Sequence, residues 1–417
     1  MGYTLVEKIL MKNTGLAAIK PGQLVTVNVD HTMVHDLFVP FVRDKFYEMG
    51  FKKVWAPNKI AFIYDHLVPT SFIEDSRHHQ IGNAFAKEQG IKKMHHGEGV
   101  CHQLMPELGY AKPGNIVFGT DSHTTTYGGI GCFSTGIGYT EMASIFGTGK
   151  LWVKVPATIK FVINGKLRKG VYAKDIILKI IGDIGADGAT YKAMEFAGTT
   201  VEAMSVASRM TLCNMAIEAG AKIGIVAPDE KICEFSNVAL EEIQDLYSDE
   251  DAVYDQIYYY NAEDIEPSVA CPSNVDNVKS ISKLEGTPID QGFLGSCTNG
   301  RLEDLAVAAK ILEGKKISPF TKFIVTPASQ KVYLEAVQKG YISTFIKAGA
   351  IIMPSACGLC CGRSGGIVAE GERVIATNNR NFLGRMGSSK AEIFLASPAT
   401  VAASVLMGKI TDPSKIN

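Results

Sequence analysis

Short apolar runs that alternate with helical stretches limit the fold of this chain more than any other feature. The runs at 24–29 (LVTVNV), 59–64 (KIAFIY) and 115–120 (NIVFGT) each have the length and composition of a strand. Helical segments separate them, and this rhythm is typical of parallel strands joined by crossover helices. The sequence therefore predicts an α/β fold of mostly parallel sheets flanked by helices.

Polar residues follow each of these three runs. They are Asp30 after the first run, Asp65 and His66 after the second, and Asp121, Ser122 and His123 after the third. Because ligands of open α/β sheets bind at the carboxyl ends of strands, we expect the three groups to converge on one cleft. The second and third groups each combine a carboxylate with a histidine, a pair that can fix the histidine's tautomer for proton transfer.

The chain is longer than one hydrophobic core usually serves, so we expect several domains in its 417 residues. A strand and turn near residue 157 begin a second unit, and the Pro-, Ser- and Asn-rich segment 266–280 has the composition of a linker into a third. We predict domains at 1–155, 156–285 and 286–417.

A further acid–base pair is expected around the second unit. Asn214 and Glu218 lie four residues apart, which puts them on one face of a predicted helix that precedes a buried strand. His102 would complete a pair if Glu218 faces it. The histidines at 78, 79, 95 and 96 are expected to be structural.

The stretch SACGLCCG at 355–362 holds three of the nine cysteines. A Cys-x-x-Cys pair on a loop can turn two thiolates toward one metal, and Cys297, which also follows a predicted strand, can complete a set of three. The ligands would be Cys297, Cys357 and either Cys360 or Cys361. From spacing alone, an iron–sulfur cluster and zinc are equally compatible with this set. The other five cysteines, at 101, 132, 213, 233 and 271, are expected to fill the core.

Two arginines in the loop ATNNRNFLGRMG (376–387) indicate an anionic substrate. Arg380 and Arg385 carry the side chain that grips carboxylates with two hydrogen bonds, so two of them suggest more than one carboxylate. A net charge of -1 gives no positive field for binding nucleic acid. Acid–base pairs beside a metal with an open position point to the addition or removal of water.

The motifs GTDSHTTTYGGIG, GSCTNGRLEDL, CGLC and NRNFLGR, in this order, resemble the aconitase superfamily, and the resemblance extends from EKIL to EIFLASPATVAAS. It implies a three-domain architecture with the active-site cleft at the domain junction. It also implies a 4Fe-4S cluster that is bound by Cys297, Cys357 and Cys360 and has one open iron. Cys361 departs from the family pattern; we expect that Cys360, not Cys361, is the ligand.

The resemblance also assigns roles to the other candidates. It implies that Asp65 and His66 handle the proton of the leaving hydroxyl, and that two supporting pairs surround the site: Asp121 with His123, and Glu218 with His102. The residues expected near the substrate or the cluster are His35, Ser122, Asn214, Asn379, Arg380 and Arg385.

The family's reaction is the isomerisation of a hydroxy-dicarboxylate by dehydration and rehydration. The expected substrate is 3-isopropylmalate, with homocitrate or homoaconitate and a dimethylmalate-type acid as alternatives. The base that removes the other proton belongs to a swivelling domain, which we expect on a separate small subunit in a heterodimer or heterotetramer. We expect a cytoplasmic location, since the N-terminal residues do not resemble an export signal. A zinc-containing anion-binding protein, and a nucleotide-dependent oxidoreductase suggested by GIGCFSTG, are the alternatives from other classes.

Overall fold

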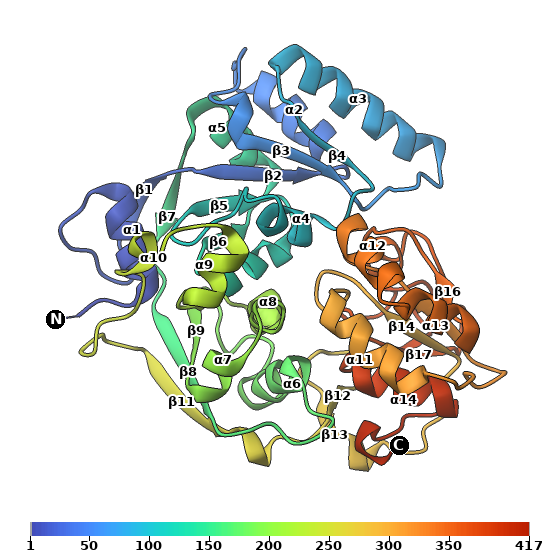
Figure 1. The fold of residues 1–417 in the computed structure, drawn as a ribbon. Coiled ribbons are helices and arrows are strands. Elements are labelled where there is room, and N and C mark those ends of the chain that lie inside the picture. Colours follow the sequence, from blue (N-terminus) through green and yellow to red (C-terminus); the bar gives the residue numbers. More distant parts are fainter. Residues whose placement is uncertain (1, 417) are drawn as a thin grey trace. The chain divides into compact units, whose positions relative to one another are not determined.

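The structure, a computed structural model, describes residues 2–416 (Figure 1). Its contacts divide the chain into two compact units. Unit 1 comprises segments 1–96, 104–164 and 189–260, and unit 2 comprises 97–103, 165–188 and 261–417. These units interleave along the chain, so each is assembled from segments that are distant in sequence. The division into three consecutive domains stays a prediction.

Unit 1 contains a five-stranded parallel sheet. In order, its strands are β4 (Lys93–His96), β3 (Ile60–Tyr64), β2 (His31–His35), β5 (Ile116–Gly119) and β6 (Phe133–Gly136). Every residue of β3 and β5 is buried, as in parallel strands that are covered on both faces. The neighbouring helices in Figure 1 are α2 (Val39–Glu48), α3 (Ile73–Gln89) and α5 (Tyr139–Thr148).

One of the three strands predicted to be parallel does not belong to the parallel sheet. β1 (Leu24–Asn28) pairs antiparallel with β7 (Lys150–Lys154) in a separate two-stranded sheet. Both strands alternate between exposed and buried residues, the pattern of a strand with one face in solvent. The placement of 24–29 in the parallel sheet was therefore wrong, and the strand that occupies that place is β2, which the sequence analysis missed.

A second sheet of unit 1 has four strands. They are β10 (Ile223–Val226), β9 (Ala193–Ala197), β8 (Thr158–Asn164) and β11 (Gln256–Asn261), in that order. β9 runs parallel to both of its neighbours. The helices of this region and of the N-terminus are α1 (Leu5–Thr14), α7 (Thr199–Ala203), α8 (Val206–Asn214), α9 (Glu230–Ser236) and α10 (Leu240–Ile243).

Close packing explains two adjacent glycines of the motif GTDSHTTTYGGIG. Gly128 and Gly129 lie in the 3-10 segment η2 (Ser122–Ile130). A Cβ at Gly128 would overlap the carbonyl oxygen of Gly224 in β10, and one at Gly129 would lie 2.6 Å from the Cα of Met210 in α8. These glycines therefore let two backbones approach, a different use from a nucleotide-binding loop.

Unit 2 is built on a seven-stranded sheet. Its order is β13 (Val278–Ser280), β12 (Ser268–Ala270), β18 (Glu392–Leu395), β17 (Arg373–Ala376), β14 (Gln291–Leu294), β15 (Lys322–Val325) and β16 (Ile351–Ile352). The strands from β18 to β16 are mutually parallel, and β12 is antiparallel to both of its neighbours. The linker predicted at 266–280 was wrong, because this segment supplies β12 and β13.

Helices of unit 2 bury apolar faces against this sheet. They are α6 (Ala173–Ile184), α11 (Leu302–Leu312), α12 (Gln330–Gln338), α13 (Tyr341–Ala348) and α14 (Pro398–Met407). Leu305, Ala309 and Leu312 of α11 join Val401 and Val405 of α14 in one core. The remaining helix, α4 (Cys101–Glu107), contains His102. Over residues 2–416, no helix combines the length and the apolarity that a membrane crossing requires.

Asp304, in the first turn of α11, makes the stability of the protein depend on pH. Burial raises the pKa of its carboxyl to about 7. A carboxyl whose pKa is raised by folding stabilises the folded state below its unfolded value of ~4 and loses this contribution as pH rises through the folded value. The free energy of unfolding of the wild type relative to Asp304→Asn should therefore fall over this interval. Urea titrations measure this difference, and a constant value would contradict the prediction.

Candidate functional site

A group of histidines and carboxylates lies at the carboxyl ends of β2 and β3 in unit 1. The Nδ1 atom of His66 is 2.7 Å from Oδ1 of Asp65, and its Nε2 atom is 3.6 Å from Oδ2 of Asp121. The ring of His35, the last residue of β2, stacks on the ring of His66 with centroids 4.3 Å apart. The polar residues that follow β3 and β5 therefore meet beside β2, as expected from parallel strands in this order.

Asp36, which was not predicted from the sequence, stabilises this group through its hydrogen bonds. Its carboxylate accepts hydrogen bonds from the main-chain N–H of His66 (3.1 Å) and of Leu67 (2.8 Å). His79 of α3 brings its Nε2 atom to 3.2 Å from the same carboxylate. Burial favours the neutral acid, but the bonds from His79 and Leu67 and the nearby histidines keep the pKa of Asp36 below its ordinary value. Its position in the sequence was a usable signal, since Asp36 directly follows the last residue of β2, as the other polar residues of the site follow β3 and β5.

Burial also determines the protonation state of His35. Burial and the neighbouring His66 together lower the pKa of the imidazole to about 4, although the nearby carboxylates oppose the shift. His35 is therefore neutral at physiological pH, and it can donate or accept a hydrogen bond without adding a positive charge.

A second pair lies next to Asp121. The Nε2 atom of His123 is 2.8 Å from Oε1 of Glu218, and its Nδ1 atom is 3.4 Å from Oδ1 of Asp121. The predicted contact between Asp121 and His123 is thus present, and Glu218 also faces His123. Asn214 is fully buried and donates from Nδ2 to Oγ1 of Thr126 at 2.8 Å.

Ser122, Glu218 and His102 were also predicted to belong to the site. Ser122 places its Oγ atom 3.5 Å from Nδ1 of His123. The single helix predicted for Asn214 and Glu218 was wrong, because α8 ends at Asn214 and Glu218 lies in the 3-10 segment η3 (Met215–Ala219). His102 belongs to unit 2, in the segment 97–103, and it is buried.

Two loops of unit 2 carry three thiols at the carboxyl ends of parallel strands. Cys297 follows β14, while Cys357 and Cys360 follow β16. All three side chains are buried. Asn379, after β17, joins the two cysteine loops: its Nδ2 atom is 3.4 Å from Sγ of Cys297, and its Oδ1 atom is 3.8 Å from Sγ of Cys360.

The two adjacent cysteines differ in their surroundings. Cys360 is buried and contacts Asn379 and the guanidinium of Arg385, whose Nη2 atom is 3.9 Å from its sulfur. Cys361 is half-buried and donates to the carbonyl of Gly358 within its own turn, at 3.2 Å. Hydrogen bonds with Cys360 and Cys361, together with burial, raise the pKa of the Cys357 thiol well above its ordinary value.

The spacing of the cysteines bears on the size of the group that they could hold. In the described part of the chain, two sets of three His, Cys, Asp or Glu ligand atoms lie within 4.8 Å of one another, and both belong to the histidine–carboxylate group of unit 1. Cys297, Cys357 and Cys360 do not form such a set. A Zn–S bond of ~2.3 Å requires the sulfurs around one zinc ion to lie closer together than this. Cys357 lies within hydrogen-bond distance of Cys360, so at least one of the wider separations is between Cys297 and these two thiols.

The arginine loop lies beside these cysteines. Burial opposes the positive charge of Arg385, but the nearby Cys360 and Cys357 keep its pKa above the ordinary value. Arg385 also lies over the ring of Phe382, with Cζ 5.5 Å from the centroid. Arg380 is half-buried and follows Asn379 directly.

Of the five cysteines expected in the core, four are buried and Cys233 is half-buried.

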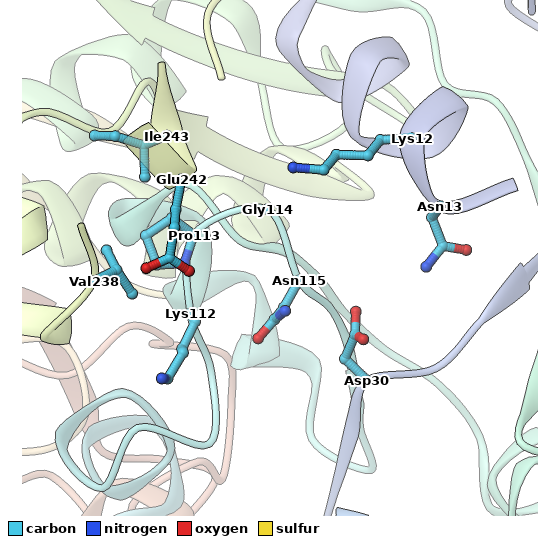
Figure 2. Close-up of a pocket in the computed structure, with 10 residues that line it drawn as sticks. All are labelled: Lys12, Asn13, Asp30, Lys112, Pro113, Gly114, Asn115, Val238, Glu242 and Ile243. Carbon is cyan, nitrogen blue, oxygen red and sulfur yellow. The ribbon is translucent and has the colours of Figure 1, made fainter. Parts of the chain in front are cut away.

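A cavity of about 360 Å³ in unit 1 shares no residue with the predicted site (Figure 2). Its lining includes the charged residues Lys12, Lys112, Asp30 and Glu242. Asp30 accepts from the main-chain N–H of Ile116 at 2.8 Å, so this carboxylate serves the fold. The expectation that Asp30 would join the other strand-end groups was wrong, because it follows the antiparallel strand β1.

Comparison with known proteins identifies the family. The sequence matches the model of the aconitase family (aconitate hydratase) at residues 7–285 and 277–408. The chain belongs to the aconitase family. This aconitase-family chain is 49% identical to the 3-isopropylmalate dehydratase large subunit 1 of Methanopyrus kandleri, with 99% of each chain covered. It is 45% identical to a probable methanogen homoaconitase large subunit of Methanothermobacter thermautotrophicus, with 99% of this chain and 97% of the relative covered.

A solved structure supports the fold. The holo-form of aconitase X from Thermococcus kodakaraensis matches with a TM-score of 0.52 and 14% identity, covering 90% of this chain and 89% of that one. The predicted α/β architecture, with mostly parallel sheets and flanking helices, is confirmed.

Proposed function

We propose that this chain is the large, catalytic subunit of a 3-isopropylmalate dehydratase, a hydro-lyase that interconverts 2-isopropylmalate and 3-isopropylmalate by dehydration and rehydration. The observation that carries the proposal is the set of three buried thiols at strand ends, with Asn379 in contact with Cys297 and Cys360. Several relatives that are 46 to 49% identical bear the name 3-isopropylmalate dehydratase large subunit. Homoaconitase is the second candidate, since one relative of 45% identity carries that name.

Cys297, Cys357 and Cys360 would hold a 4Fe-4S cluster. Three buried thiols at strand ends fit this cluster, and they would leave one of its irons without a protein ligand. When bound, the cluster supplies a Lewis acid that stabilises negative charge on the departing hydroxyl. Arg385 adds a positive charge beside Cys360 and thereby favours the anionic thiolate that binds iron.

Asp65 and His66 would manage the proton of the leaving hydroxyl. The carboxylate of Asp65 accepts from Nδ1 of His66 at 2.7 Å, which leaves Nε2 as the atom that exchanges a proton with the substrate. Asp36 fixes the main chain at His66 because its carboxylate accepts hydrogen bonds from the N–H groups of His66 and Leu67. Asp121, which accepts from the main-chain N–H of His123, and Glu218, which is hydrogen-bonded to Nε2 of His123, would support this pair, and His102 would have a supporting role from unit 2.

The substrate's carboxylates would be bound by the arginine loop. Arg380 and Arg385 supply two-pronged donors, while Ser122 and the neutral His35 supply hydrogen bonds without further charge. Asn214 and Asn379 hold the surrounding loops in place. Two arginines in one loop match a dicarboxylate better than a monocarboxylate.

A small subunit with the swivelling domain would supply the base that removes the proton alpha to a carboxylate. The name "large subunit" of the relatives supports a second polypeptide, in a heterodimer or heterotetramer. We also propose the three consecutive domains, the cytoplasmic location and the place in leucine synthesis that follow from this assignment. A dimethylmalate-type acid is the remaining alternative substrate.

An anaerobic assay tests this proposal. The chain is reconstituted with iron and sulfide, mixed with the candidate small subunit, and given the unsaturated diacids that correspond to isopropylmalate and to homoaconitate. We expect hydration of the isopropyl compound only when both subunits are present, by a brown protein that bleaches in air. Preference for the homoaconitate compound would favour the second candidate. A colourless protein with bound zinc, or full turnover by this chain alone, would refute the proposal.

A further inference from the structure

A buried lysine of unit 2 binds the main chain of the segment that carries Asn379. Lys174 is in the first turn of α6, and its side chain has no exposed surface. Its Nζ atom donates to the carbonyl oxygens of Thr377, at 2.9 Å, and of Asn378, at 2.5 Å. A buried ammonium is costly unless it is well paired, so two main-chain carbonyls from a segment over 200 residues away are a specific arrangement.

These carbonyls directly precede Asn379, the residue that contacts both cysteine loops. Thr377 is tied to the loop after β14, because its Oγ1 atom accepts from the N–H of Gly295 at 2.9 Å and donates to the Gly295 carbonyl at 3.0 Å. Asn379 then reaches Sγ of Cys297 at 3.4 Å and Oγ1 of Thr298 at 3.0 Å. The position of the Asn379 amide is therefore set by a short, rigid segment that Lys174 holds.

A second buried cation holds the neighbouring loop in the same manner. Arg301 donates to the carbonyls of Cys297, at 2.7 Å, and Thr298, at 2.8 Å. Its Nε atom donates to Oε1 of Gln103 at 3.0 Å. Each of the two loops therefore offers two consecutive carbonyls to one buried cation, Lys174 for the loop after β17 and Arg301 for the loop after β14. The two loops contact each other through Asn379 and Cys297.

We propose that Lys174 is a positioning residue for the cysteine centre: its ammonium fixes the segment 377–379, so that the Asn379 amide lies between Cys297 and Cys360, and its charge stabilises negative charge at the centre. This inference rests on the proposed function. Residues that orient metal ligands from outside the first layer typically change metal affinity or activity by ~10- to 100-fold when they are replaced.

The carboxylate of the adjacent Asp175 is hydrogen-bonded to the main chain. Its carboxylate accepts from the main-chain N–H groups of Tyr172, at 2.8 Å, and Ser268, at 2.9 Å. Burial raises the pKa of Asp175 to about 7, so at neutral pH a substantial fraction of it is uncharged. Burial is the largest influence on this pKa and the positive charge of Lys174 opposes it, so that charge acts on Asp175 as well as on the loop.

The test compares Lys174→Met, Lys174→Arg and a control, Lys179→Met, in the reconstituted two-subunit enzyme. Methionine has a similar length but no charge, and arginine restores the charge and donors. Lys179 is on the same helix but pairs with Asp183 at the surface, at 2.5 Å. The measurements are iron content, the midpoint reduction potential of the cluster, kcat/KM and urea unfolding.

We expect Lys174→Met to shift the potential to more negative values and to lower kcat/KM by ~10- to 100-fold, with partial recovery in Lys174→Arg and no change in Lys179→Met. A purely structural lysine would change the urea midpoint but leave the potential of the folded, loaded enzyme unchanged, and that result overturns the inference. If Lys174→Met does not fold, Lys174→Gln, a neutral donor, is measured by the same criteria. A wild-type chain that binds no cluster would instead refute the proposed function.

Discussion

Replacing Cys360 with alanine is expected to abolish iron binding and activity, whereas replacing Cys361 leaves both largely intact. The reason lies in their surroundings, since Cys360 is buried between Asn379 and Arg385 while Cys361 bonds to its own turn. Loss of a Lewis-acidic metal removes several kcal/mol of transition-state stabilisation, so activity should fall by ~10³-fold or more.

The measurement is iron and sulfide content after anaerobic reconstitution, followed by the hydration assay with the small subunit. Cys361→Ala is the matched control, because it changes the next residue of the same loop. Cluster loss in Cys361→Ala with retention in Cys360→Ala would reverse the assignment of the ligand. Equal loss in both variants would show that the loop, and not a particular thiol, determines binding.

Replacing His66 with asparagine should lower kcat by ~10²- to 10⁴-fold, the usual contribution of a positioned acid or base. The Nδ1 atom of His66 is held by Asp65, and asparagine retains polarity but cannot exchange the proton at Nε2. Asp65→Asn should give a smaller loss of the same kind, since the imidazole would keep its place but lose its preferred tautomer.

Both variants should keep the iron content of the wild type, because these residues belong to unit 1 and the cysteines to unit 2. His95→Gln is the control, because His95 has no proposed role in the reaction. Its Nε2 atom is 3.2 Å from the hydroxyl oxygen of Tyr110. Wild-type rates in His66→Asn would exclude this histidine as the residue that manages the hydroxyl proton.

The chemical groups of the candidate site could be predicted because their signals are local. Asp65 and His66 are adjacent, and the cysteines at 357 and 360 have a spacing that points two thiols the same way. The supporting residues could not be predicted in this way. His79 was expected to be structural only, and its contact with Asp36 joins residues that are 43 positions apart. The contacts of Lys174 with Thr377 and Asn378 span more than 200 positions.

The strand predictions show the same limit. The runs at 59–64 and 115–120 correspond to buried parallel strands, but the run at 24–29 forms an antiparallel pair with β7. The alternation of apolar and polar residues over 25–29 (VTVNV) was the available signal, since a strand covered on both faces has no such alternation. The segment 266–280 has the composition of a linker and yet forms two strands at the edge of a sheet, because pairing with β18 overrides local preference.

The sequence by itself determined the α/β class, the thiols and acid–base groups at strand ends, and the family, because period, spacing and motif order are properties of neighbouring residues. Only the tertiary structure decided which strands pair, that Glu218 faces His123, and that buried cations hold the cysteine loops. Those outcomes depend on sheet order and on the burial of charge. Both arise when segments that are far apart in the chain pack together.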